Sequence, residues 1–127
     1  MNIASWIVQG LLALAFVAAG FLKTFTPIDQ LAQQMVWVPD VPSWVPRLAG
    51  IAEILGAIGL IVPSLTRIQP KMTVYAAYGL IAVMVLAAIF HLSRGEGSMV
   101  VPNIIFSLLA GFVAWVRTSK APIAPKS

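Results

Sequence analysis

The residues best suited to chemistry are four polar side chains that interrupt or border long apolar segments: Lys23, Glu53, His91 and Asn103. An amine, a carboxyl, an imidazole and an amide can together donate hydrogen bonds, accept them and move a proton. Because a polar group inside a bilayer is costly, its position there is a sign of function. These residue types predict a polar, ligand-binding cluster, and they identify no catalytic residue.

Each of the four also has a structural interpretation, which stays open. Glu53 and Lys23 can contact each other, directly or through one water, as an ion pair that only fixes helix packing. Lys23 can instead extend to the headgroups from a helix end, and His91 can lie at the interface. Asn103 follows Pro102 and can satisfy free backbone groups where a helix begins. The convergence of all four at one place is what favours a functional role.

The composition indicates an integral membrane protein. Of 127 residues, 60% are hydrophobic and only 9% are charged, with a mean hydropathy of +0.94. A soluble domain carries about 25% charged residues, so the soluble-enzyme and disordered classes are excluded. The net charge of +4 is spread over single basic residues between apolar segments. We therefore expect membrane lipid as the surroundings and no nucleic-acid partner.

Four apolar segments have the length of membrane-spanning helices, about 17–25 residues: 3–23, 46–63, 71–92 and 99–117. Since lipid offers no partner for backbone groups, each must be helical. The sequence predicts an all-α fold, an antiparallel four-helix bundle in one domain over residues 1–117. Residues 118–127 are expected to be a basic, disordered tail. A cleaved signal peptide is disfavoured, because no basic segment precedes the first apolar one.

The connection between the first two apolar segments is the only long one. Apolar residues recur at helical spacing between Ile28 and Val36, which predicts a short helix lying in the interface. Prolines then forbid continued helix. Trp37 and Trp44 follow, and we expect both to anchor at the headgroups.

The basic residues predict the orientation. With the N-terminus inside, five of the eight Lys and Arg residues face the cytoplasm and three face outward, which agrees with the positive-inside rule. Both termini are then cytoplasmic, and Lys23, Glu53, His91 and Asn103 all lie toward the outer side.

Polar and small residues share one face on each predicted helix, and these faces should meet inside the bundle. Gln9, Thr73 and Arg117 lie on such faces, as do three glycines predicted to pack helices together: Gly20, Gly56 and Gly59.

The chain has no cysteine and a single histidine. Disulfides, iron–sulfur clusters and thiolate sites are therefore excluded, and one chain cannot supply two histidine ligands to a haem. We expect no metal site and no intrinsic cofactor.

Three stretches carry a resemblance to a known family. They are AGFLKTF, with Gly20 and Lys23; GIAEILGAIGLIVPSLTR, with Glu53, Gly56 and Gly59; and the segment that ends at His91. They are similar to the DoxX-like family of small bacterial membrane proteins, over nearly the whole chain. The resemblance implies a four-helix bundle in the bacterial inner membrane, with Lys23 and Glu53 facing inward.

The family's members imply an accessory or quinone-binding role linked to a membrane redox system, beside an oxidoreductase partner. A quinone head group needs hydrogen bonds within an apolar cavity; Lys23, His91 and Asn103 offer donors, and Glu53 can relay a proton. Two alternatives remain: a structural or chaperone-like protein that docks on larger membrane proteins, and a small transporter or channel subunit that forms a homo-oligomer. The sequence does not decide whether the protein has enzymatic turnover.

Overall fold

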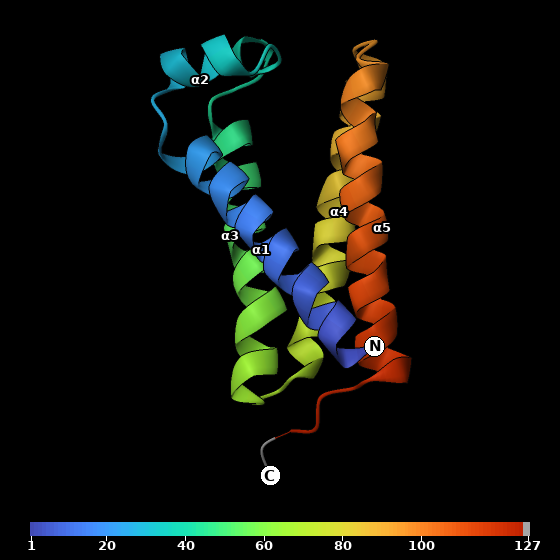
Figure 1. The fold of residues 1–127 in the computed structure, drawn as a ribbon. Coiled ribbons are helices and arrows are strands. Elements are labelled where there is room, and N and C mark those ends of the chain that lie inside the picture. Colours follow the sequence, from blue (N-terminus) through green and yellow to red (C-terminus); the bar gives the residue numbers. More distant parts are fainter. Residues whose placement is uncertain (126–127) are drawn as a thin grey trace.

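The computed structural model describes residues 1–125, and helices account for nearly all of them (Figure 1). The five α-helices are α1 (Asn2–Phe25), α2 (Ile28–Gln34), α3 (Trp44–Thr66), α4 (Lys71–Ser93) and α5 (Val100–Trp115). Two short 3-10 turns, η1 (Val38–Asp40) and η2 (Gly97–Met99), and a π-helical turn, η3 (Val116–Lys120), complete the secondary structure.

Four helices are long and apolar enough to cross a membrane, the fourth being the continuous stretch from η2 through η3. Their mean hydropathy lies between 1.9 and 2.2. Large apolar side chains cover the outer surface, among them Leu55, Leu86 and Leu108. Such a surface suits lipid and not water. The predicted fold class is confirmed: the protein is a multi-pass, all-α membrane bundle, and its short helix α2 lies between the first two spans.

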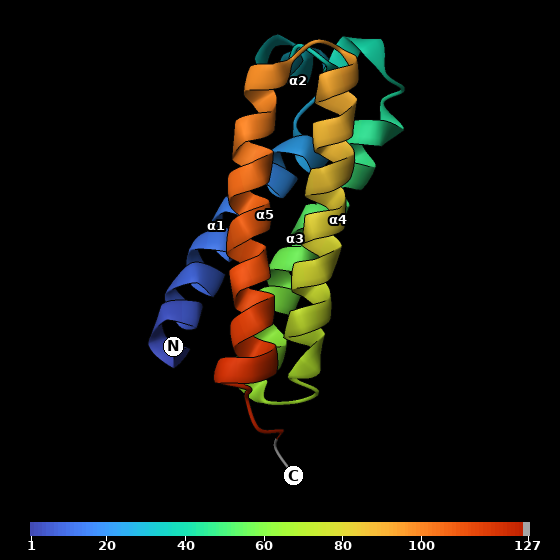
Figure 2. The ribbon, with the colours of Figure 1, turned by 90° about the vertical axis from the view of Figure 1, so that its right-hand side faces the viewer.

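The spanning helices form two antiparallel pairs. Helix α1 crosses α3, and α4 lies beside α5, while α3 also packs on α4 (Figures 1 and 2). Helix α2 lies at one end of the bundle, above α1 and α3, and the N-terminus and residues 121–125 lie at the other (Figure 1). We refer to these as the α2 end and the termini end.

Local sequence explains where the helices stop. Helix α1 ends just before Pro27, because the residue before a proline is restricted to extended conformations. Helix α3 ends at Arg67, which adopts the left-handed conformation (φ 61°) that closes many helices. Pro70 then starts α4, a position that needs no amide hydrogen. The resulting turn is short, so α3 and α4 are antiparallel neighbours.

One core runs along the bundle. Its buried members are apolar or small and come from all four spans: Leu12, Phe16, Ala57, Leu60, Ala77, Leu80, Met84, Ala110, Val113 and Ala114. Two of the predicted packing glycines lie against α4. A Cβ on Gly56 would be 2.5 Å from Leu80 Cδ2, and a Cβ on Gly59 would be 2.6 Å from Ala76 Cβ. The small-residue face of α3 therefore allows α4 to approach closely.

The expected disordered tail needs correction where the structure describes it. Thr118 to Lys120 continue the last span as a π-helical turn, and residues 121–125 lie across the termini end, where Arg67 Nε donates to the Ala124 carbonyl oxygen at 2.9 Å. A prolonged helix lets Lys120 stack on Trp115, with 5.4 Å from Nζ to the ring centroid, a contact that composition did not indicate. Residues 126 and 127 lie outside the described part.

Helices α1 and α3 approach each other closely at two glycines. A Cβ on Gly20 would lie 2.6 Å from the Gly50 carbonyl oxygen, and a Cβ on Gly50 would lie 2.7 Å from the Gly20 carbonyl oxygen. The clash on each side is with backbone, which cannot move aside as a flexible side chain can. Gly20 was predicted to pack helices, whereas its partner Gly50 was not.

This crossing predicts a strict requirement for glycine. Gly20→Ala should destabilise the protein by about 1–3 kcal/mol, the usual cost of overpacking. Gly10→Ala is the matched control, because it lies on the same helix with nothing within 4 Å of the added Cβ. Thermal unfolding in detergent measures both. Equal melting temperatures for the two variants would show that α1 and α3 do not cross at Gly20.

Candidate functional site

A buried ion pair joins the two helices just beyond their glycine crossing. Lys23 Nζ, near the end of α1, lies 2.5 Å from Glu53 Oε1 on α3. The carboxylate side chain is only 2% exposed and the lysine 18%. Sequence reasoning expected direct or water-bridged contact, and the contact is direct. The Lys23 side chain extends from the end of α1 toward the bundle interior and not outward to the headgroups.

Arg47 holds the end of α1 against the start of α3. Its Nη1 lies within hydrogen-bond distance of three carbonyl oxygens at the helix end, those of Lys23 (3.1 Å), Thr24 (2.7 Å) and Thr26 (2.6 Å). The last carbonyls of a helix lack partners within it, so one guanidinium satisfies several at once. Sequence reasoning missed this role. The signal was an arginine at the start of one helix, opposite the end of its neighbour.

The ion pair forms one wall of a cavity of about 410 Å³ between α1 and α3 on one side and α4 and α5 on the other. All four residues predicted to form the polar cluster line it: Lys23, Glu53, His91 and Asn103. Trp44, Leu48 and Leu86 also line it and are largely exposed on the outer surface of the bundle. The cavity therefore reaches the lipid-facing surface between α3 and α4.

Aromatic side chains close the cavity at the α2 end. Trp37 meets the Phe90 ring edge-on, with 5.8 Å between ring centroids. Both rings line the cavity. Trp37 is only 9% exposed and packs with Leu31 and Val38, whereas Trp44 is 63% exposed. Leu31, Trp37 and Val38 pack in one cluster with Val45 of α3, Phe90 of α4 and Met99, which the sequence pattern alone did not reveal.

His91 belongs to a network of hydrogen bonds that joins η1 to the end of α4. Its Nδ1 lies 3.0 Å from Glu96 Oε1, which also accepts from Arg94 Nε at 3.1 Å. Arg94 Nη2 in turn donates to Asp40 Oδ2 at 2.8 Å. The hydrogen bond from His91, then that from Arg94, holds the pKa of Glu96 below its ordinary value.

The low pKa of Glu96 keeps this carboxylate charged at neutral pH, where it orients the imidazole. With Nδ1 donating to Glu96, the other ring nitrogen of a neutral His91 is an acceptor. Hydrogen bonds to Asp40 and then Glu96 raise the pKa of Arg94, so the guanidinium stays charged as well. His91 does not contact the Lys23–Glu53 pair; the two polar groups face one cavity from different helices.

Asn103 has an unmet hydrogen-bonding group. Its amide nitrogen is buried and makes no hydrogen bond within residues 1–125. Buried polar atoms are almost always paired, and Asn103 lines the cavity. A ligand acceptor in the cavity would satisfy it.

A second buried polar cluster lies at the termini end. Arg117 Nε donates to Gln9 Oε1 at 2.8 Å, and Gln9 Nε2 donates to the Leu60 carbonyl oxygen at 2.6 Å. Ser64 and Thr73 share a hydrogen bond of 2.6 Å beside it. Sequence reasoning placed Gln9, Thr73 and Arg117 on inward faces but did not join them, because helix periodicity gives directions without distances.

The donors of the first cavity suit a neutral polar ligand better than a metal. Among residues 1–125, no group of three or more His, Cys, Asp and Glu side chains could hold a metal ion. The cavity offers an ammonium, an amide and an imidazole within an apolar and aromatic wall. Such a site can orient a flat, weakly polar molecule from the lipid phase and exchange a proton with it.

These features define a four-span membrane bundle with a polar cavity that opens toward lipid. The sequence profile of the DoxX-like family matches residues 7–113, which cover the second and third spans in full and most of the first and fourth. The chain belongs to the DoxX-like family. No curated protein and no solved structure gives a significant match to the chain.

The geometry predicts that Lys23 and Glu53 are energetically coupled. Glu53→Gln and Lys23→Met should each destabilise the protein, by about 3 kcal/mol or more, because each leaves a largely buried charge without its partner. The double variant should recover part of that loss. Thermal unfolding of the four proteins in detergent gives the coupling energy. Simple additivity of the two losses would show that the pair is not coupled.

Proposed function

We propose that this DoxX-like protein binds the head group of a membrane quinone in the cavity beside Lys23 and Glu53, as an accessory subunit of a membrane redox system. The observation that carries the proposal is the buried, unpaired amide nitrogen of Asn103, which lines the same lipid-reaching cavity as the ion pair and His91.

The size and lining of the cavity fit this ligand class. Small-molecule sites commonly enclose about 300–1,000 Å³ and place a few polar groups in an apolar wall, and this one encloses about 410 Å³. Trp37, Trp44 and Phe90 offer flat surfaces for a ring, and Leu86 marks the side on which an isoprenoid chain would leave for the lipid. A bound quinone would supply the electron-accepting ring.

The polar residues have distinct parts in the proposal. Asn103 donates its free N–H to one ring carbonyl oxygen. Lys23 uses one direction toward Glu53 and keeps two N–H groups for a ligand. Glu53 bonds the lysine through Oε1, so its other oxygen can hold or release a proton. His91, oriented by Glu96, lines the same cavity and would pass that proton on toward the α2 end.

An oxidoreductase partner completes the proposal. The chain contains no cysteine and one histidine, so a protein-held redox centre would come from another subunit. In this arrangement the DoxX-like protein holds and protonates the quinone, and the partner exchanges electrons with it.

Quinone binding is measurable through tryptophan fluorescence, because quinone rings quench nearby indoles. Titration of the purified protein with a short-chain ubiquinone analogue should give saturable quenching. Replacing both Trp37 and Trp44 with Phe should remove most of it, because the other two tryptophans do not line the cavity. Asn103→Ala should weaken binding by about three- to tenfold, the worth of one hydrogen bond.

Ser107→Ala is the control for Asn103→Ala, because Ser107 lies one turn further along α5 and does not line the cavity. Quenching that never saturates, or equal affinity in the Asn103 and Ser107 variants, would refute quinone binding at this site.

We also propose that the termini end faces the cytoplasm of a bacterial inner membrane. Among residues 1–125, four basic side chains, Arg67, Lys71, Arg117 and Lys120, gather at that end, whereas three, Lys23, Arg47 and Arg94, belong to the half nearer the α2 end. This distribution follows the positive-inside rule.

Single-cysteine variants test the orientation, since the native chain has no cysteine. Gly97→Cys at the α2 end should react with an impermeant thiol reagent on intact cells. Ile68→Cys at the termini end should react only after permeabilisation. Both positions are exposed in the structure, so the opposite pattern would reverse the orientation, and reaction of both would contradict the number of spans between them.

A further inference from the structure

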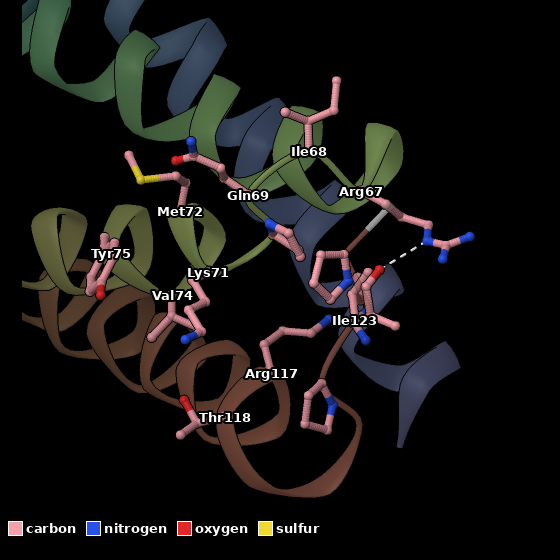
Figure 3. Close-up of a pocket in the computed structure, with 14 residues that line it drawn as sticks. Arg67, Ile68, Gln69, Lys71, Met72, Val74, Tyr75, Arg117, Thr118 and Ile123 are labelled. Atoms are coloured by element: carbon pink, nitrogen blue, oxygen red, sulfur yellow. Dashed lines mark hydrogen bonds between the residues drawn. The ribbon is translucent and has the colours of Figure 1, made fainter. Parts of the chain in front are cut away.

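A second and larger cavity lies at the termini end, far from the first. It encloses about 1100 Å³ between the turn that joins α3 to α4, the end of the last span and the tail (Figure 3). Its basic lining residues are Arg67, Lys71 and Arg117. The tail contributes residues 122–125 to its wall.

The cavity lies in a field of uncompensated positive charge. At the α2 end, Lys23 and Arg94 pair with carboxylates. The sequence has no Asp or Glu in residues 1–22, 54–95 or 97–127. The termini end therefore contains no acidic side chain. The α4 helix also begins here, at Lys71, and the N-terminus of a helix carries partial positive charge. The lining therefore favours an anion.

Arg117 gives the specific sign of a ligand. The residue is only 5% exposed, and its Nη2 is buried with no hydrogen-bond partner within residues 1–125. Its other nitrogens are fixed: Nε donates to Gln9, and Nη1 donates to Asn2 Oδ1 at 2.7 Å and to the Ala121 carbonyl oxygen at 2.9 Å. The guanidinium lies 5.3 Å from the Trp6 ring centroid.

Within residues 1–125, this arginine is oriented by neutral groups, and no carboxylate contacts it. A buried cation without an anion is costly, and arginine forms strong paired hydrogen bonds with phosphate oxygens. Figure 3 shows its side chain extending from the helix end toward Ile123 of the tail. An anion placed there would complete its hydrogen bonding.

The tail already supplies oxygen atoms to the two arginines. Ala121 and Ala124 offer carbonyl oxygens to Arg117 and Arg67, respectively. These are neutral acceptors, and charge-assisted bonds are roughly twice as strong as neutral ones. A phosphate could therefore take over both places as the tail shifts, and it would gain Lys71 as a third cation.

The remaining wall is apolar. Met72, Val74 and Tyr75 of α4, with Ile123 of the tail, line the cavity beside the basic residues. A basic group at the end of membrane-spanning helices, next to apolar surface, matches an anionic lipid: the phosphate meets the cations and the acyl chains follow the helices.

We infer that this cavity binds the phosphate of an anionic phospholipid, through Arg67, Lys71 and Arg117. The site lies at the opposite end of the bundle from the candidate quinone cavity and does not depend on it. A bound lipid would hold the basic side chains and the last helical turn in place, so the protein would be more stable in anionic membranes than in neutral detergent.

The test compares thermal unfolding of the full chain in a neutral detergent with and without added lipid. Phosphatidylglycerol should raise Tm by about 3 °C or more, and the same amount of phosphatidylcholine should not, since a ligand that binds only the folded state stabilises it. Inorganic phosphate is the third arm. A rise of equal size with phosphate alone would show that the site binds a soluble anion and would overturn the lipid assignment.

Variants localise the effect. Lys71→Gln and Arg67→Gln should each remove at least half of the phosphatidylglycerol shift. Lys120→Gln is the matched control: it deletes the same charge at the same end, but Lys120 stacks on Trp115 and does not line the cavity. An equal loss in the Lys120 variant would show general surface attraction and no defined site. Arg117→Gln does not decide between these outcomes, because Arg117 also donates hydrogen bonds to Gln9 and Asn2, and its loss would disturb the fold. The conclusion therefore rests on the two exposed residues, Arg67 and Lys71.

Discussion

The ion pair between Lys23 and Glu53 depends on a close approach of two helix backbones, and much of the fold follows from that approach. Gly20 and Gly50 let α1 and α3 touch, which brings the lysine within 2.5 Å of a carboxylate that is almost wholly buried. In a lipid environment either charge alone would be expelled or neutralised. The crossing and the pair therefore require each other, and Arg47 secures both by capping the end of α1.

The charged side chains are paired differently at the two ends of the bundle. At the α2 end, acidic side chains balance the basic ones, and His91, Arg94 and Glu96 form a closed network over an aromatic wall. At the termini end, the hydrogen-bond acceptors of Arg67 and Arg117 within residues 1–125 are neutral oxygen atoms, such as that of Gln9. One end is thus suited to a neutral ring from the lipid phase and the other to a phosphate.

Membership in the DoxX-like family and the observed cavities lead to one picture of the protein. It is a small bundle with no cysteine and one histidine. It has a polar pocket that reaches the lipid-facing surface and a basic cavity at the opposite end. Both proposed ligands are membrane components, as suits a chain whose helices expose apolar side chains on nearly every outer face.

The sequence by itself determined the spans and their antiparallel order, because lipid requires each apolar segment to be helical. It also determined that Lys23, Glu53, His91 and Asn103 face inward, because a polar side chain that faces lipid is costly. The sequence also predicted that Lys23 and Glu53 interact, but only the tertiary structure decided that this contact is direct and which partner His91 takes. Glu53 meets Lys23 while His91 turns to Glu96, since helix crossing points are set by the side-chain volumes of two segments together. The burial of Trp37 and the place of the tail depend likewise on contacts between residues far apart in the chain, and no local pattern encodes them.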